Sequence, residues 1–511
     1  MKHLKIISIV IILCFSTFGF YAIADSKRYP PEVEKVLLKT EKNRKELEKF
    51  LDYCKNTNDS LKWKAACFLV ANMDAHYSEN YKWLTPDNQP YAFDELSYST
   101  FDQAQAVRDK LLAEKAMKAE YYTTNDIETV TADVLENQVR RAFQQWKQPW
   151  AKHLTFKQFS ETLLPYRCVN EKFENWYPAY EKEFNFMKEK KMLNVWQATS
   201  LLNEYIFNHF VSSFTFENRI EPIAFLSPLQ LLFRQQGPCQ DNVNYISLAM
   251  KSQGIPCFID YVPYHATSTG RHYWNATQTE DGKIIPFETD KNGIHPFRLK
   301  REPGKVFRIG YAKQPGNLPD SYPTEKIPNN HLKRQNLKDV TAEYWKVTNL
   351  DWNMEQNVSQ KISFVCVLNG LGWRGVDWCT IQDKKLYFKN MSTGVVYLPA
   401  IFDGKKYIPV AYPQSVDSLG IKRILKPNLE NRIKVIMREE EHYLIFRPGK
   451  KYIFYYWNNG WIKTSEMTAG DVPELEFENI PCNALYLMIP EYSKGKERPF
   501  TINNEGTRIW W

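Results

Sequence analysis

Apolar residues recur three and four positions apart through the first part of the chain, a spacing that predicts amphipathic helices. Pro31-Glu32 suits a helix start, and Asp59-Ser60 is a capping pair in front of the apolar run 61–73. The same spacing continues through the segments 101–120, 129–146, 154–166, 171–190 and 195–211. The pattern therefore predicts an α-helical domain over residues 25–195.

The pattern changes between residues 196 and 345. A helix-length apolar run, 243–253, ends at Gly254-Ile255-Pro256, and β-type segments follow at 257–262, 272–279, 284–287 and 306–311. Glu280-Asp281-Gly282-Lys283 has the composition of a hairpin turn. We expect an α+β core in which a helix packs on an antiparallel sheet. Residues 314–335 are rich in Pro, Asn and Lys and predict a linker or lid.

Strands and turns fill the rest of the chain, and a weak repeat runs through them. Segment 386–390 precedes 396–400, and the similar segment 475–479 precedes 485–489 at the same offset. The repeat predicts two β-sandwich modules, 346–424 and 425–511. Each copy has tryptophans upstream, which serve either as core or as a platform for a carbohydrate or peptide.

The N-terminal 24 residues have the features of a secretory signal peptide. Two lysines precede an apolar run, 6–20, that is too short to span a bilayer, and Ala22-Ile23-Ala24 is a cleavage signal. We expect cleavage after Ala24 and an exported protein. Cys14 raises the alternative of a lipid anchor, although Leu13 stands where a small residue is needed.

Charge and cysteine usage narrow the class of protein. The net charge of +8 over 511 residues is mild, and the basic runs are short, so no nucleic-acid partner is expected. The eight cysteines beyond the signal lie far apart without a CxxC pair, so the sequence predicts neither a disulfide framework nor a metal site. Nothing in it implies a cofactor or sets the oligomeric state.

Gly237-Pro238-Cys239 is the strongest candidate for chemistry. Glycine and proline suit a turn that enters a helix, and Cys239 then lies at the first helical turn. Unpaired N–H groups and the positive end of the helix dipole lie there, so we expect a lowered thiol pKa and donors for an oxyanion. A buried, inert thiol is the alternative.

A base and a carboxylate follow the cysteine on separate predicted strands. His272 is the predicted base, and Glu288 is predicted to accept from its ring and fix its tautomer. His265 is a competing base, while Asp260 and Asp290 compete with Glu288. For substrate binding we name Trp274, Asn275 and Gln236.

Together these residues resemble the transglutaminase-like superfamily, which has a papain-like thiol fold. Its pattern is a G-x-C helix, an exit ending in G-I-P, an H-x-W strand and an aspartate on the next strand. Gly237-Pro238-Cys239, Gly254-Ile255-Pro256, His272-Tyr273-Trp274 and Glu288 stand at these places. The sequence departs from the pattern at two positions, since Glu288 replaces the aspartate and Lys251 stands near an expected arginine.

More loosely, the whole chain resembles exported transglutaminase-domain proteins of Bacteroidetes. The likeness rests on the segments 43–48, 65–73 and 164–167 and on the terminal β-modules. The resemblance implies a cysteine hydrolase, peptidase or acyltransferase of the periplasm or cell surface of a Gram-negative bacterium. Its substrate would be a protein, peptide or glycopeptide. The alternative is a catalytically degenerate surface protein that binds a glycan or protein through its β-modules.

Overall fold

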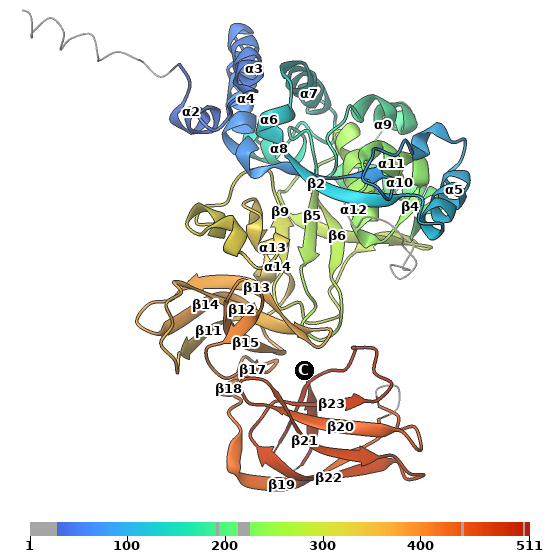
Figure 1. The fold of residues 1–511 in the computed structure, drawn as a ribbon. Helices are drawn as coiled ribbons and strands as arrows, with labels where there is room; N and C mark the ends of the chain where they lie inside the picture. The colour runs from blue at the N-terminus through green and yellow to red at the C-terminus, as the bar shows by residue number, and fades with distance from the viewer. Residues whose placement is uncertain (1–27, 191–193, 213–224, 441–443, 504–505) are drawn as a thin grey trace, which may run out of the picture. The chain divides into compact units, whose positions relative to one another are not determined.

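The computed structural model describes residues 28–190, 194–212, 225–440, 444–503 and 506–511 (Figure 1). The predicted signal peptide lies outside the described residues. The chain forms two compact units, one from residues up to 78 with 123–141, the other from 79–122 with 142–511. Among the described residues, no helix has both the length and the apolar character needed to cross a membrane.

The smaller unit is helical, as its spacing predicts. Asp59 caps the third of its helices by accepting from the backbone of Leu61 and Lys62. The apolar stripe of the second helix is fully buried, from Leu47 to Cys54, and this helix packs against the third. The helices of this unit are α2 (Pro31–Leu37), α3 (Arg44–Asn56), α4 (Ser60–Asn72), α6 (Asp126–Thr129) and most of α7 (Ala132–Gln145).

Two segments predicted as single helices are divided. The segment 101–120 contains α5 (Phe101–Ala113) and then the start of β2 (Lys118–Asn125), which pairs with β1 (Tyr77–Leu84). Lys115 has a left-handed backbone (φ 53°) that ends the helix, and the aromatic and β-branched residues at 121–124 favour a strand. The segment 171–190 holds the short helix α9 (Tyr177–Glu183) and a 3₁₀ turn, Asn185–Glu189.

The centre of the larger unit is a six-stranded sheet in which every neighbouring pair is antiparallel. Its order is β10 (Leu337–Asp339), β9 (Phe307–Ile309), β5 (Cys257–Val262), β6 (His272–Gln278), β7 (Ile284–Asp290) and β8 (Gly293–Pro296). Helix α12 (Cys239–Ser252) packs against β5 and β6, and α9, α10 (Val195–His209) and α11 (Pro228–Arg234) contact α12 (Figure 1). The predicted mixed helix and sheet architecture is confirmed.

Polar side chains from upstream segments hold the C-terminal end of α12. Lys251 is buried and donates to the carbonyls of Pro165 and Arg167, so the cation at this position is satisfied by backbone oxygens. The indole of Trp150 donates to Gln253 O, and the hydroxyl of Tyr177 donates to Ser252 O. Residues 142–190 therefore pack with the sheet, and the compact units divide the chain elsewhere than at residue 195.

The C-terminal region contains two β-modules with the same strand order. In each module the first and fourth strands form a two-stranded sheet that faces a larger sheet. The larger sheet contains, in spatial order, the third, second and fifth strands of the module and then its last two strands. The first contains β11 (Val347–Asn353), β12 (Ile362–Asn369), β13 (Gly372–Thr380), β14 (Lys385–Ser392), β15 (Val395–Phe402), β16 (Tyr407–Pro409), β17 (Gln414–Val416) and β18 (Lys422–Ile424). The second contains β19 (Asn428–Arg438), β20 (Lys451–Trp457), β21 (Trp461–Thr468), β22 (Glu474–Cys482), β23 (Tyr486–Pro490), β24 (Phe500–Ile502) and β25 (Arg508–Trp510).

One buried tyrosine in each module shows that the repeat extends to side chains. The hydroxyl of Tyr397 donates to Ser392 O at 2.8 Å, and that of Tyr486 donates to Pro481 O at 2.6 Å. Both bonds reach back five residues to the end of the preceding strand, the arrangement of a tyrosine corner in β-sandwiches. The weak repeat in the sequence thus corresponds to equivalent strands.

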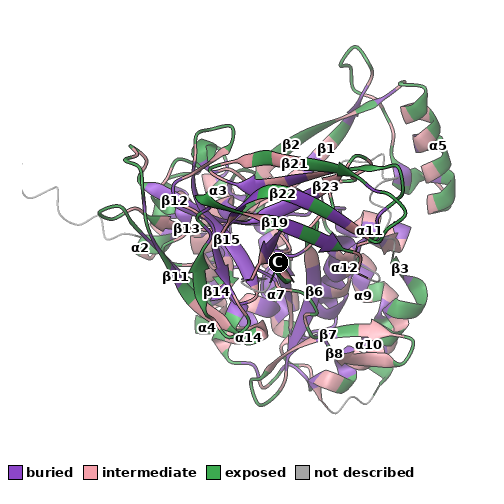
Figure 2. Ribbon diagram, turned by 90° about the horizontal axis from the view of Figure 1, so that it is seen from below, coloured by how far each residue is buried: buried purple, intermediate pink, exposed green. Residues whose placement is uncertain are grey.

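Strand β12 is buried along its whole length (Figure 2). One face packs in the core of its own module, with Val365 and Val367. The other face, with Phe364 and Cys366, packs in a second cluster with Trp457 of the other module and with segment 318–332. The predicted linker or lid at 314–335 is therefore a packed part of the structure, because it covers the outer face of this sheet.

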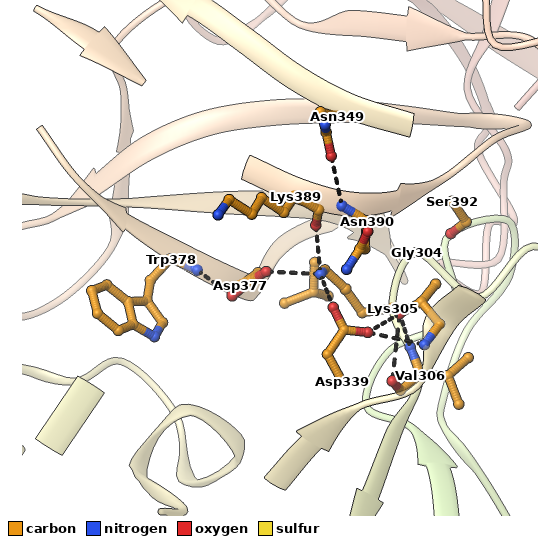
Figure 3. Close-up of polar contacts among 12 residues, drawn as sticks. Gly304, Lys305, Val306, Asp339, Asn349, Asp377, Trp378, Lys389, Asn390 and Ser392 are labelled. Atoms are coloured by element: carbon orange, nitrogen blue, oxygen red, sulfur yellow. Dashed lines mark hydrogen bonds and ion pairs between the residues drawn. The ribbon is translucent and has the colours of Figure 1, made fainter. Parts of the chain in front are cut away.

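A buried lysine joins the six-stranded sheet to the first β-module (Figure 3). Lys305 is 1% exposed and donates to Asp339 at 2.5 Å and to the carbonyl of Lys389 at 2.7 Å. Its nitrogen also lies 3.0 Å from Asp377. Burial alone lowers the pKa of Lys305, but the two aspartates raise it above its ordinary value. This ammonium therefore has three acceptors and stays charged.

His331 holds segment 314–335 between the sheet and the first β-module. Its Nδ1 accepts from the hydroxyl of Tyr261 at 2.7 Å, and its Nε2 donates to Val376 O at 3.2 Å. These bonds use both ring nitrogens of the neutral form. Burial lowers the pKa of His331 to about 3.

We expect His331 to make the stability of the protein depend on pH. Between pH 6.5 and about 3 the unfolded ring binds a proton and the folded ring does not, so stability is lost as pH falls through this range. The loss approaches about 1.4 kcal/mol per pH unit. His331→Gln should reduce this slope by about one proton in urea unfolding measured from pH 7 to pH 4. His209→Gln, at an exposed ring, is the control; an unchanged slope in the His331 variant contradicts this account.

Candidate active site

A cavity of about 530 Å³ brings most of the predicted site residues together. Its lining includes Cys239, His272 and Glu288, together with Trp274 and Asn275. Gln236 is not part of this lining; it lies in β4 (Gln236–Gly237), where it pairs with Val211 of β3 (Val211–Ser212). The rest of the wall is mainly apolar and includes Ile206, Phe210, Val243, Ile246, Phe287 and Phe297.

Cys239 is the first residue of α12, as the sequence predicts. Pro238 precedes it with an extended backbone, and Gly237 is close to the first turn of the helix. A side chain at position 237 would meet the Cβ and a carboxylate oxygen of Asp241 at 2.6 Å, so only glycine fits there. Asp241 is buried at the positive end of the helix dipole, a position that favours a carboxylate.

The sulfur of Cys239 lies against the strand that carries His272. Its side chain packs against the apolar cluster that includes Tyr273 of β6. Burial raises the pKa of Cys239 above its ordinary value, and the backbone N–H groups of Tyr273 and Gln240 and the charge of Arg271 only reduce the shift. The expectation of a lowered thiol pKa is wrong for this structure, because burial outweighs the helix terminus.

His272 lies among aromatic rings. The centres of the Trp274, Phe297 and His265 rings are 5.8, 5.7 and 6.4 Å from its own. Burial lowers the pKa of His272, and the nearby charge of Arg301 lowers it further. The ring is neutral at pH 7, so the cysteine and histidine are both uncharged here and do not form an ion pair.

Glu288 lines the cavity, but its carboxylate lies near His295 of β8 and not near His272. Its carboxylate is 3.6 Å from Nε2 of His295, and its carbonyl accepts from Nδ1 of the same ring. Within the described residues no hydrogen bond joins Glu288 to His272. The pairing of β6 with β7 ends at Asn275 and Phe287, one residue before Glu288. The structure therefore brings the three residues to one cavity without the predicted carboxylate–histidine contact.

The three competing residues, His265, Asp260 and Asp290, do not line the cavity. His265 is not part of the cavity lining, and burial lowers its pKa to about 4. Asp260 is fully buried and accepts from Arg308 and from the hydroxyl of Tyr344. Asp290 lies 3.6 Å from His295, as Glu288 does. None of them makes a hydrogen bond to His272 within the described part of the chain.

Trp274 and Asn275 have structural partners as well as a place on the cavity wall. The indole of Trp274 donates to Tyr344 Oη and its ring stacks on Phe297, with centres 4.8 Å apart. The amide nitrogen of Asn275 donates to Val243 O and Ser247 Oγ of α12. Asn275 therefore joins β6 to the helix that carries Cys239.

Two cavity residues were not found from the sequence. Asn203 is 1% exposed, and its Oδ1 has no hydrogen-bond partner within the described residues; the same holds for Oδ1 of Asn242. Asn242 follows Cys239 by three positions and so lies on the same side of α12, which is a signal the sequence contains. Asn203 comes from α10, and only the packing of that helix on α12 brings it here.

Neither a metal cluster nor a disulfide occurs in the described part of the chain, where the eight cysteines are free thiols. A scan of the sequence against protein-family models finds no match, and a search among curated proteins finds none either. The family resemblance therefore depends on the motif residues of the sequence alone.

We expect the alkylation of Cys239 by iodoacetamide to be slow at neutral pH and to increase beyond about pH 8.5, the ordinary thiol pKa. The reason is that a raised pKa leaves little thiolate at pH 7. Peptide mapping by mass spectrometry measures the rate, and Cys239→Ala removes the labelled peptide. Cys168, whose pKa burial raises to about 12, is the internal control and should stay unlabelled. An alkylation rate that stops rising below pH 7 would mean that Cys239 is already a thiolate there, which contradicts a neutral Cys239 and His272.

Proposed function

We propose that this protein is a transglutaminase-like cysteine enzyme that cleaves or transfers an amide or peptide bond through a thioester on Cys239. The observation that carries the proposal is the cavity of about 530 Å³ that Cys239 and His272 both line. Cys239 also packs against the apolar cluster that includes Tyr273, the residue next to His272. A nucleophile and a base beside one substrate-sized space are what acyl transfer requires.

The neutral pair suits general-base attack. As the sulfur bonds to the substrate carbonyl, its proton passes to the imidazole of His272. The backbone N–H of Gln240, at the start of α12, is a donor near the forming oxyanion. The imidazolium then gives the proton to the leaving amine as the C–N bond breaks. Water attacks the thioester with His272 as the base, and the carboxylic acid leaves as the thiol re-forms.

The wall of the cavity supports a peptide or protein substrate. Asn203 and Asn242 add polar residues to the cavity wall, and the apolar remainder of the wall suits an apolar side chain of a peptide. Hydrolysis needs no second substrate site, and we therefore favour it over cross-linking. The predicted signal peptide supports export, and the resemblance to exported Bacteroidetes proteins implies the periplasm or the cell surface of a Gram-negative bacterium as the place of action.

Acylation by p-nitrophenyl acetate tests the proposal. The wild type should release p-nitrophenol with a burst and form an acetyl-enzyme on Cys239 that mass spectrometry detects. Cys239→Ala should abolish both, and His272→Ala should slow acylation roughly 10²-fold or more, the usual contribution of a general base. Glu288→Gln should cause a much smaller loss, because its carboxylate contacts His295 instead.

A wild type without a burst or acetyl-enzyme contradicts the enzyme proposal and favours a binding protein. The observation behind that second candidate is a cavity of about 290 Å³ in the second β-module, lined by Tyr452, Tyr492 and Trp510 among others. Aromatic rings in a concave site suit a glycan or peptide ligand.

Removing the charge of Arg301 should shift the acid limb of the pH–rate profile, the pH range in which acylation is lost as the pH falls. His272 acts as a base only when it is neutral, and its lowered pKa places the loss of activity below pH 6.5. Arg301→Gln removes a positive charge that disfavours the imidazolium, so the pKa of His272 rises and the limb moves to higher pH. The pH dependence of the p-nitrophenol burst measures this shift. Arg298→Gln is the matched control, and equal limbs in the two variants contradict the role of Arg301.

A further inference from the structure

The loop that leads into His272, residues 263–271, is held by the first β-module. Asn369, the last residue of β12, is 8% exposed. The two N–H groups of its amide are shared among three carbonyls of the loop, those of His265 at 2.9 Å, Ser268 at 2.9 Å and Gly270 at 3.0 Å from the nitrogen. Its oxygen accepts from Gly270 N at 3.3 Å. One side chain thus links three residues of the loop, and the last of them, Gly270, lies two residues before His272.

Apolar packing attaches the same loop to the module. Ala266 is buried in the core cluster of the first β-module, and Tyr264 packs against that cluster. From the other side, Thr267 donates to Glu302, and Arg301 donates to Ser268 Oγ. The loop is therefore attached on one side to the β-module and on the other to the segment that follows β8, while residues 269–271 remain exposed.

The hairpin turn that follows Asn369 holds a leucine in a left-handed backbone conformation. Its two turn residues, Gly370 and Leu371, both have left-handed backbones, with φ of 60° and 61°. Such a conformation at leucine costs of order 1–3 kcal/mol and persists where surrounding contacts impose it. A side chain at Gly370 would meet Thr269 of the loop at 3.6 Å, so the turn lies directly on the loop.

We propose that Asn369 is a positioning residue for His272, and that the first β-module supports the catalytic site rather than acting as a separate binding module. This inference rests on the proposed function. The amide of Asn369 fixes the loop end, and the loop end fixes the start of β6. Strand β6 carries His272 and also Tyr273, which lies in the apolar cluster against which Cys239 packs. An error of about 1 Å in the placement of a base costs about 10²-fold in rate.

Asn369→Asp is the sharpest test, because it keeps the shape and replaces the amide donors by an acceptor that faces three carbonyls. Two reactions at the same sulfur separate positioning from general damage. Acylation by p-nitrophenyl acetate needs His272 as a base, whereas alkylation by iodoacetamide at a pH where its rate has levelled off needs none. We expect Asn369→Asp to slow acylation about tenfold and to leave that limiting alkylation rate unchanged.

Asn349→Asp is the matched control. Asn349 lies in the same module, and its oxygen accepts from the backbone of Asn390, away from the loop. It should leave both rates unchanged. Asn369→Ser, a smaller change, should give an intermediate acylation rate and serves if the aspartate variant does not fold.

The outcomes distinguish this inference from the proposed function. A wild type that acylates with dependence on His272, together with a folded Asn369 variant that acylates at the same rate, overturns the role of Asn369 alone. Equal losses of acylation and of limiting alkylation overturn it too, since they indicate a structural defect at the sulfur. A wild type that does not acylate overturns both.

Discussion

The contact between helix α12 and strand β6 is the constraint on which the rest of the structure depends. It joins the helix that begins with Cys239 to the strand that begins with His272, through the amide of Asn275, which donates to Val243 O and Ser247 Oγ. Because this amide is buried, neither element can shift without leaving unpaired donors. Helices α9 to α11 cover α12 and hold it on the sheet.

The burial that makes this contact rigid also sets its electrostatics. It raises the pKa of Cys239 and lowers that of His272, so both shifts favour the neutral forms. A thiolate–imidazolium pair needs stabilisation that a carboxylate orienter would supply, and Glu288 instead lies beside His295. The geometry therefore favours proton transfer during the attack over a resting ion pair.

The two β-modules share a strand order and a tyrosine corner, yet their surroundings differ. The first is enclosed by the six-stranded sheet, by segment 318–332 and by the second module, with Lys305 and His331 as its buried polar links. The second has a cavity of its own. The two modules therefore share a fold but differ in context. The first packs against other parts of the protein, and the second has a cavity lined by aromatic residues.

The sequence by itself determined the elements with strong local signals. The Asp59 cap, the strand 257–262, the start of α12 at Cys239 and the repeat of the β-modules follow from spacing, turn chemistry and capping, which act over a few residues. Tertiary structure decided the rest. Burial reversed the expected pKa of Cys239, the register of β7 turned Glu288 toward His295, and Asn369 reached the loop before His272 from about a hundred residues away. Burial and long-range contacts are properties of the packed chain, and no local pattern records them.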